Sequence, residues 1–133
     1  LGVIKHGTIS WMKVRTEVSA FQIGPASFIT IPGEIYPEIV NGGVVSPPGQ
    51  DYAIAPLEVP PLRSFMQGKF KFVFGLANDE IGYIIPKSEW DVKPPYLYND
   101  DESPYGEENS IGPETAPIVY SSLIELLGSL YND

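Results

Sequence analysis

The sequence contains no cysteine and a single histidine, His6, among its 133 residues. Without thiols the chain forms no disulfide and no thiolate zinc site. One imidazole cannot furnish a histidine-rich metal centre or a Ser-His-Asp triad, and no partner stands at metal-ligand spacing from His6. P-loop, dinucleotide and Gly-x-Ser-x-Gly patterns are also absent. We therefore expect His6 on the surface and no complete zinc site within this chain.

Basic residues and long apolar runs are scarce as well. Eight Lys and Arg stand against seventeen Asp and Glu, which gives a net charge of −9. The basic residues form no run, so the composition argues against a nucleic-acid surface, and the acidity is typical of a solvated exterior. No apolar stretch reaches the length of a membrane span, and no signal peptide is visible. The sequence starts at Leu1, which a truncated or processed start would explain.

Strand patterns dominate the first half of the sequence. Residues 14–23 alternate between apolar and polar side chains, residues 27–31 are apolar and β-branched, and Gly24 with Pro25 supplies a turn between them. These two strands predict a hairpin. Residues 70–76 predict a third strand, which we expect to be buried because three of its alternating residues are Phe. Three strands are few for an independent sheet, which favours a piece of a larger domain.

Helical patterns are fewer. Residues 34–40 predict a short helix that ends at the glycines following Asn41. Residues 44–63 and 94–113 are proline-rich and predict irregular connections. The clearest element is a C-terminal helix that packs on the sheet, with Thr115 as its N-cap. Its apolar stripe consists of Val119, Leu123, Leu126, Leu127 and Leu130.

Together these patterns predict an α+β fold, or a layered α/β fold, within residues 1–133 as a single domain or a fragment. A short sheet made of a hairpin and a further strand is covered by the C-terminal helix. We expect this assembly to be part of a larger domain.

Two strand ends carry side chains suited to chemistry. The turn through Pro32 and Gly33 aims Glu34 off the end of a strand, although a carboxylate in the first turn of a helix would have the same pattern. Segment 75–83 delivers Asn78 and Tyr83 into a glycine-flanked turn, for which an Asx-type turn with Tyr packed over it is the alternative. Asp79 and Glu80 are adjacent in this segment, so their side chains point to opposite faces and make a poor acid–base pair.

The two strand ends together resemble the neutral/alkaline ceramidase family. In that family a strand runs into a Pro-Gly-Glu turn, as at residues 31–34, and a later strand ends in Gly-Leu-x-Asn with a Tyr five residues on, as at residues 75–83. The hairpin turn at residues 21–24 and the Tyr-Gly-Glu segment at residues 105–107 are also similar to the family. The resemblance covers residues 14–113 in order.

The resemblance implies the C-terminal part of the catalytic domain of a zinc-dependent amide hydrolase. Family members hold zinc with two His from an earlier part of the domain, one Glu and one Tyr. Matching the motifs implies Glu34 and Tyr83 as metal ligands and Tyr105 as the catalytic hydrogen-bond donor to an oxyanion. Because both His ligands are missing here, the implied zinc site is incomplete and this chain alone is not expected to be active.

The family implies an N-acyl lipid or another amide as substrate, the upstream part of the same protein as a partner, and a secreted or cell-surface location. The loops before Tyr83 and before Tyr105 are longer than in the family, which leaves the substrate open. Two alternatives remain. One is a non-catalytic binding or structural module with the same fold, in which the acidic and Tyr-rich loops form a recognition surface. The other is a small self-contained domain unrelated to the family.

Overall fold

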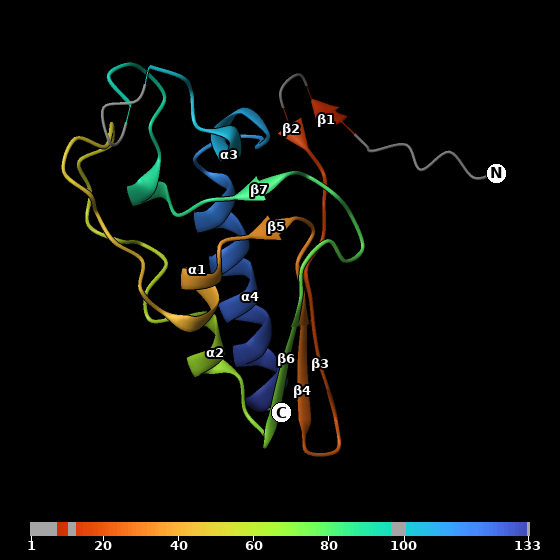
Figure 1. The fold of residues 1–133 in the computed structure, drawn as a ribbon. Helices are drawn as coiled ribbons and strands as arrows, with labels where there is room; N and C mark the ends of the chain where they lie inside the picture. Colours follow the sequence, from red (N-terminus) through yellow and green to blue (C-terminus); the bar gives the residue numbers. More distant parts are fainter. Residues whose placement is uncertain (1–7, 11–12, 97–100, 133) are drawn as a thin grey trace.

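The structure is a computed structural model that describes residues 8–10, 13–96 and 101–132. The predicted surface position of His6 lies outside the described residues. Within them, a run of strands is followed by two short helices, two further strands and a C-terminal helical part, and these elements pack as a small sheet with helices beside it (Figure 1). The predicted α+β class is confirmed. No helix in the described part of the chain is long and apolar enough to cross a membrane.

The main sheet has three strands in the order β3-β4-β6. Strands β3 (Ser19–Ile23) and β4 (Ala26–Thr30) form the predicted antiparallel hairpin, and β6 (Phe70–Phe74) lies parallel to β4 on its other side. The predicted first strand begins later than expected. Its first residue, Val14, belongs to β2 (Lys13–Val14), which pairs with β1 (Thr8–Ser10) in a separate ribbon, and residues 15–18 form no strand.

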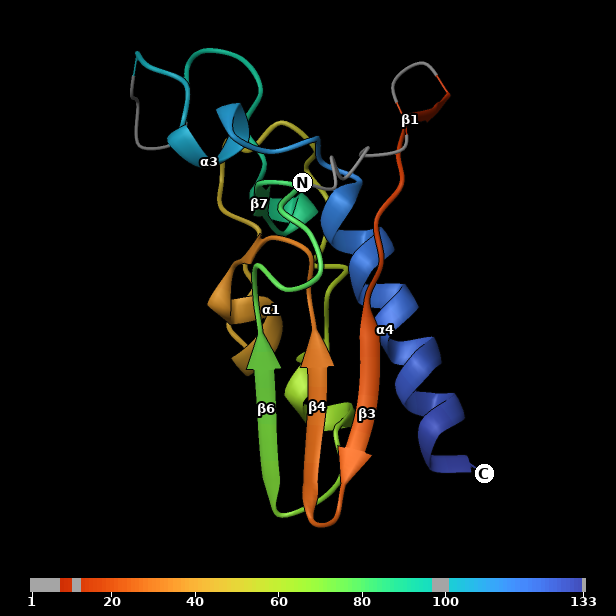
Figure 2. The same cartoon turned by 90° about the vertical axis from the view of Figure 1, so that its right-hand side faces the viewer.

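Beyond the main sheet, the chain continues from both parallel strands into a second parallel pair. Strands β5 (Glu34–Ile35) and β7 (Tyr83–Ile84) pair in register, just past the ends of β4 and β6 (Figure 2). The helix predicted over residues 34–40 is therefore wrong at its start, and α1 spans Pro37–Asn41. The Glu34 amide donates to the Gly82 carbonyl at 3.0 Å, so a cross-strand bond takes the place of the first helical turn.

The C-terminal helix is α4 (Thr115–Asn132), and it runs along the sheet next to β3 (Figures 1 and 2). Val119, Leu123 and Leu127 of the predicted stripe are buried, whereas Leu126 is 38% exposed. Thr115 is the first helical residue rather than the N-cap, and its hydroxyl donates to the Gly112 carbonyl at 2.7 Å. The remaining helical segments are short: α2 (Leu62–Phe65), the 3₁₀ turn η1 (Lys87–Glu89) and α3 (Tyr105–Glu108).

The core lies between α4 and the face of the sheet that carries Ile29. It is made mostly of aliphatic side chains from β4, the strand extensions, α1, α2 and α4, among them Ile29, Ile39, Leu62, Leu123 and Leu127.

The expectation that the phenylalanines of β6 are buried is wrong. Phe70, Phe72 and Phe74 are 44–48% exposed. The alternation in β6 is as predicted, but α4 covers the opposite face of the sheet, the one to which Val73 belongs. Periodicity tells which residues share a face, whereas the helix decides which face is buried.

Candidate functional site

The two segments singled out from the sequence lie side by side. The Ile81 amide donates to the Pro32 carbonyl at 2.8 Å, and the Leu76 amide donates to the Gly33 carbonyl at 3.1 Å. A side chain at Gly33 would overlap the carbonyl oxygen of Gly82. Glycine at position 33 therefore allows the backbone approach from which β5 and β7 begin.

Glu34 and Tyr83 are direct register partners at the start of this second strand pair. The pKa of the Tyr83 phenol is raised, and its polar interaction with the Glu34 carboxylate is the largest cause. The negative charge of Glu34 adds to the same effect. Two oxygen donors thus meet at the strand ends, with Glu34 exposed to solvent.

Tyr105 joins this pair from a distant part of the sequence. It opens α3, is 70% exposed, and its ring lies edge-on to that of Tyr83 with centroids 5.8 Å apart. The segment that carries Tyr105 is held by the Tyr83 amide, which donates to the Asn109 carbonyl at 2.9 Å. The structure therefore brings Glu34, Tyr83 and Tyr105 together, despite the long loop that precedes Tyr105.

The other polar residues of segment 75–83 do not join the candidate site and instead stabilise the turn of the segment. The Asn78 amide group donates to the Thr30 hydroxyl at 2.9 Å, and the Asp79 carboxylate accepts from the Glu80 amide at 2.9 Å. Glu80 accepts from the Gly82 amide at 2.8 Å. Two of these bonds join side chains of the segment to its own backbone within two residues and stabilise the turn.

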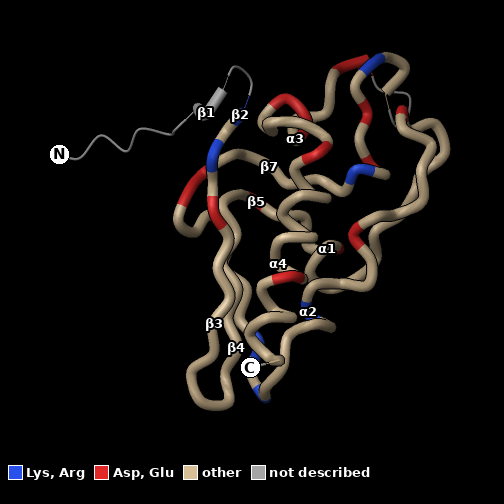
Figure 3. Tube along the Cα trace, turned by 180° about the vertical axis from the view of Figure 1, so that it is seen from behind, with Lys and Arg blue, Asp and Glu red and all other residues tan. Residues whose placement is uncertain are grey.

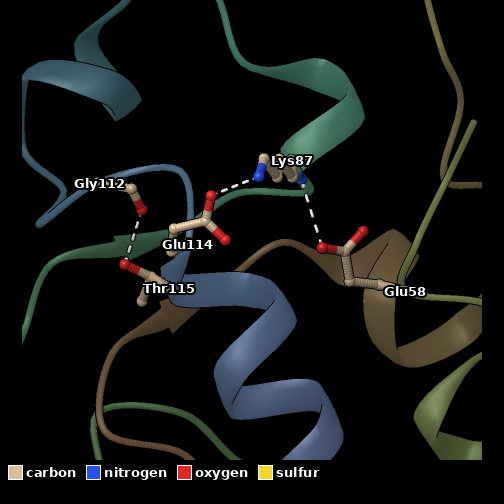
Figure 4. A network of polar contacts seen from close by, with 5 residues as sticks. All are labelled: Glu58, Lys87, Gly112, Glu114 and Thr115. Atoms are coloured by element: carbon tan, nitrogen blue, oxygen red, sulfur yellow. Dashed lines mark hydrogen bonds and ion pairs between the residues drawn. The ribbon is translucent and has the colours of Figure 1, made fainter. Parts of the chain in front are cut away.

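The β7 end of the site is tied to the helix layer by a polar network (Figure 4). The Lys87 amide donates to the buried Glu58 carboxylate at 3.3 Å, and the Lys87 ammonium pairs with Glu114, which precedes α4. Burial raises the pKa of Glu58 despite this backbone bond. Because Lys87 follows β7 closely in sequence, these contacts fix the strand against the start of α4.

Sequence reasoning missed a cavity of about 490 Å³ beside Tyr105. Tyr36 is on its wall, and the Tyr36 ring is edge-on to Tyr83 at 6.3 Å. Burial, followed by the charges of Glu107, Glu38 and Glu89, raises the pKa of Tyr36 to about 12. The sequence offers one signal for Tyr36. It lies two residues after Glu34, so in an extended chain both side chains point to the same side.

A metal could use this site only as part of a larger ligand set. Glu34 and Tyr83 offer adjacent oxygen donors, and a carboxylate is an established zinc ligand. In the described part of the chain, however, no group of three or more His, Cys, Asp or Glu side chains is placed to hold a metal ion. The two oxygens thus account for two of the four ligands of a tetrahedral zinc site.

Comparison with known proteins does not place the chain in a family. No protein-family model, no curated protein and no solved structure matches it.

Proposed function

We propose that this chain supplies two oxygen ligands, Glu34 and Tyr83, to the zinc site of an amide hydrolase whose imidazole ligands come from outside the chain. One observation carries the proposal: residues from two separate motifs are register partners on paired parallel strands, and the Glu34 carboxylate is the main cause of the raised pKa of Tyr83. Paired strands hold both donors on one rigid edge, which is what a metal site with defined geometry needs.

The roles of the residues follow from their positions. A bound zinc ion would supply an activated water and polarise the amide carbonyl. The Glu34 carboxylate and the Tyr83 phenol oxygen are the groups that would hold the metal, and the pairing of β5 with β7 places the two residues side by side. The exposed Tyr105 hydroxyl, carried on a ring that packs against Tyr83, would donate a hydrogen bond to the developing oxyanion.

The uncovered face of the main sheet supports a larger domain. Phe21, Phe28, Phe72 and Phe74 stack on this face, with ring centroids 4.9 Å apart for Phe21 and Phe28 and 5.1 Å apart for Phe28 and Phe72. Strand β6 is also an edge strand within the described residues. An exposed apolar face and an open edge are expected where further structure packs.

The same face also favours a second candidate, a binding or structural module without chemistry. Exposed stacked aromatic side chains suit protein recognition whether or not metal is held nearby. The two candidates differ in one measurable property, the zinc content of the whole protein.

The zinc proposal is tested by metal analysis of the full-length protein purified without chelator. We expect about one zinc per chain. Glu34→Gln should lower the zinc content at least about ten-fold, because an anionic ligand becomes a neutral amide. Glu125→Gln, an exposed change on α4, makes the same charge change as a control.

Two results would end this proposal: full-length protein without stoichiometric zinc, or zinc content that is the same in Glu34→Gln and in Glu125→Gln. Zinc-free protein that remains folded would favour the binding module. Circular dichroism of each variant separates loss of metal from loss of fold.

A further inference from the structure

The cavity beside Tyr105 is surrounded by negative charge. Carboxylates of Glu89, Glu102 and Glu107 line it, and among the described residues no Lys or Arg does so. Figure 3 shows acidic positions on α3 and on the chain segments near α3. A concave site lined by charges of one sign concentrates ligands of the opposite sign.

One of these carboxylates has an unused oxygen. Oε2 of Glu107 is buried and has no hydrogen-bond partner in the described part of the chain. Oε1 of Glu89 accepts from the Val45 amide at 3.0 Å. Burial is the largest cause of the raised pKa of both carboxyl groups. A buried anionic oxygen without a partner is costly, and positive charge in the adjoining cavity would offset that cost.

The rest of the wall is aromatic and apolar. Tyr36 and Tyr105 line the cavity, and each ring packs against Tyr83 between them. Ile85 and Pro104 complete the apolar part. Aromatic rings attract organic cations through their π faces, and apolar walls accept the alkyl part of such a ligand. The described carboxylates do not form a group placed for a metal ion, which favours an organic cation.

We propose that this cavity binds an organic ammonium group. The ammonium lies beside the carboxylates of Glu107 and Glu89, while its alkyl chain packs against Tyr36, Ile85 and Pro104. This binding requires no metal and stands independently of the zinc proposal. If both hold, the amine portion of the amide, or the amine released from it, occupies this cavity next to Tyr105.

Calorimetric titration of the chain with n-butylammonium chloride and with n-butanol, at neutral pH and constant ionic strength, tests the proposal. The two probes share an alkyl chain and differ in charge. We expect butylammonium to bind at least about ten-fold more tightly than butanol. Glu107→Gln should weaken butylammonium binding by about five- to ten-fold. Tyr105→Leu should weaken it by about three-fold through loss of the ring.

Glu108→Gln is the matched control, because Glu108 is exposed, neighbours Glu107 and does not line the cavity. It changes the net charge equally and should alter binding less than about two-fold. Equal affinity for butanol, or equal weakening by Glu108→Gln, would overturn the proposal. Should Glu107→Gln fail to fold, Glu89→Gln takes its place with the same expectation. The zinc content of the full-length protein should be unchanged by Glu107→Gln, so the two proposals fail separately.

Discussion

Close backbone contact at single glycines sets the geometry of the candidate site. Gly33 and Gly82 lie where β5 and β7 begin, and a Cβ at either position would overlap a backbone carbonyl oxygen. Gly82 also has φ +85°, a conformation that other residues adopt at a cost. The position of Glu34 relative to Tyr83 therefore depends on the absence of two side chains.

Replacement of Gly33 by Ala should destabilise the protein. The added methyl group meets the backbone of Gly82, which cannot move without breaking the strand pair. We expect a loss of about 1–3 kcal/mol in the free energy of unfolding, measured by urea denaturation. Gly128→Ala is the control: it adds the same methyl group to open space on α4 and should stabilise by about 0.5–1 kcal/mol. Equal effects of the two substitutions would contradict this account.

The buried carboxyl group of Glu58 predicts an unusual pH dependence of stability. Burial raises its pKa in the folded protein above the ordinary value of 4.5. Its stabilising contribution is therefore complete below that value and is lost as pH rises through the folded pKa. The raised pKa values of Glu89 and Glu107 act in the same direction. Asp51, whose pKa is lowered, has the opposite effect, but in a lower pH range.

We expect the free energy of unfolding to be larger near about pH 5 than near about pH 7. Glu58→Gln should reduce this difference, because a neutral amide does not titrate. Glu125→Gln controls for the general relief of negative charge and should change the difference less. Chemical denaturation at the two pH values measures the effect. Greater stability at the higher pH in the unmodified protein would count against the role assigned to Glu58.

At the scale of elements, helix α4 decides which face of the sheet is core. Leu123 is fully buried against the sheet, whereas Leu126 on the same helix is 38% exposed. Leu123→Ala should lower the free energy of unfolding by about 2–5 kcal/mol because it leaves a cavity. Leu126→Ala should cost less than about 1 kcal/mol. Thermal or urea unfolding of both variants shows which substitution lowers the free energy of unfolding more. A larger decrease for Leu126→Ala would show that α4 packs differently.

Elements with regular patterns and local turns were predictable. The hairpin, β6 and the C-terminal helix each follow from periodicity within a short window. Residues 34–35 were not predictable, because their strand pairing uses residues about fifty positions away. Tyr105 joins the candidate site for the same non-local reason. Its own neighbours in sequence indicate only an irregular, acidic segment.

At the scale of the whole molecule, the stacked phenylalanine face departs from an ordinary monomer surface. If further structure covers this face, the chain alone should bind a hydrophobic dye and associate with itself. Phe72→Thr should reduce both, whereas Val92→Thr, at an isolated residue that is 51% exposed, should change neither. Dye fluorescence and sedimentation velocity measure these properties. Dye binding that is unaffected by Phe72→Thr would place the adhesive surface elsewhere.

The sequence alone determined the α+β class and the strand and helix patterns, because these depend on local periodicity. A family resemblance carried by short motifs suggested Glu34, Tyr83 and Tyr105 as candidate residues. Tertiary structure alone decided which sheet face is buried, that Glu34 starts a strand, and that an acidic cavity opens beside Tyr105. Each of these depends on contacts between segments far apart in the chain, and local patterns carry no information about which distant segments meet.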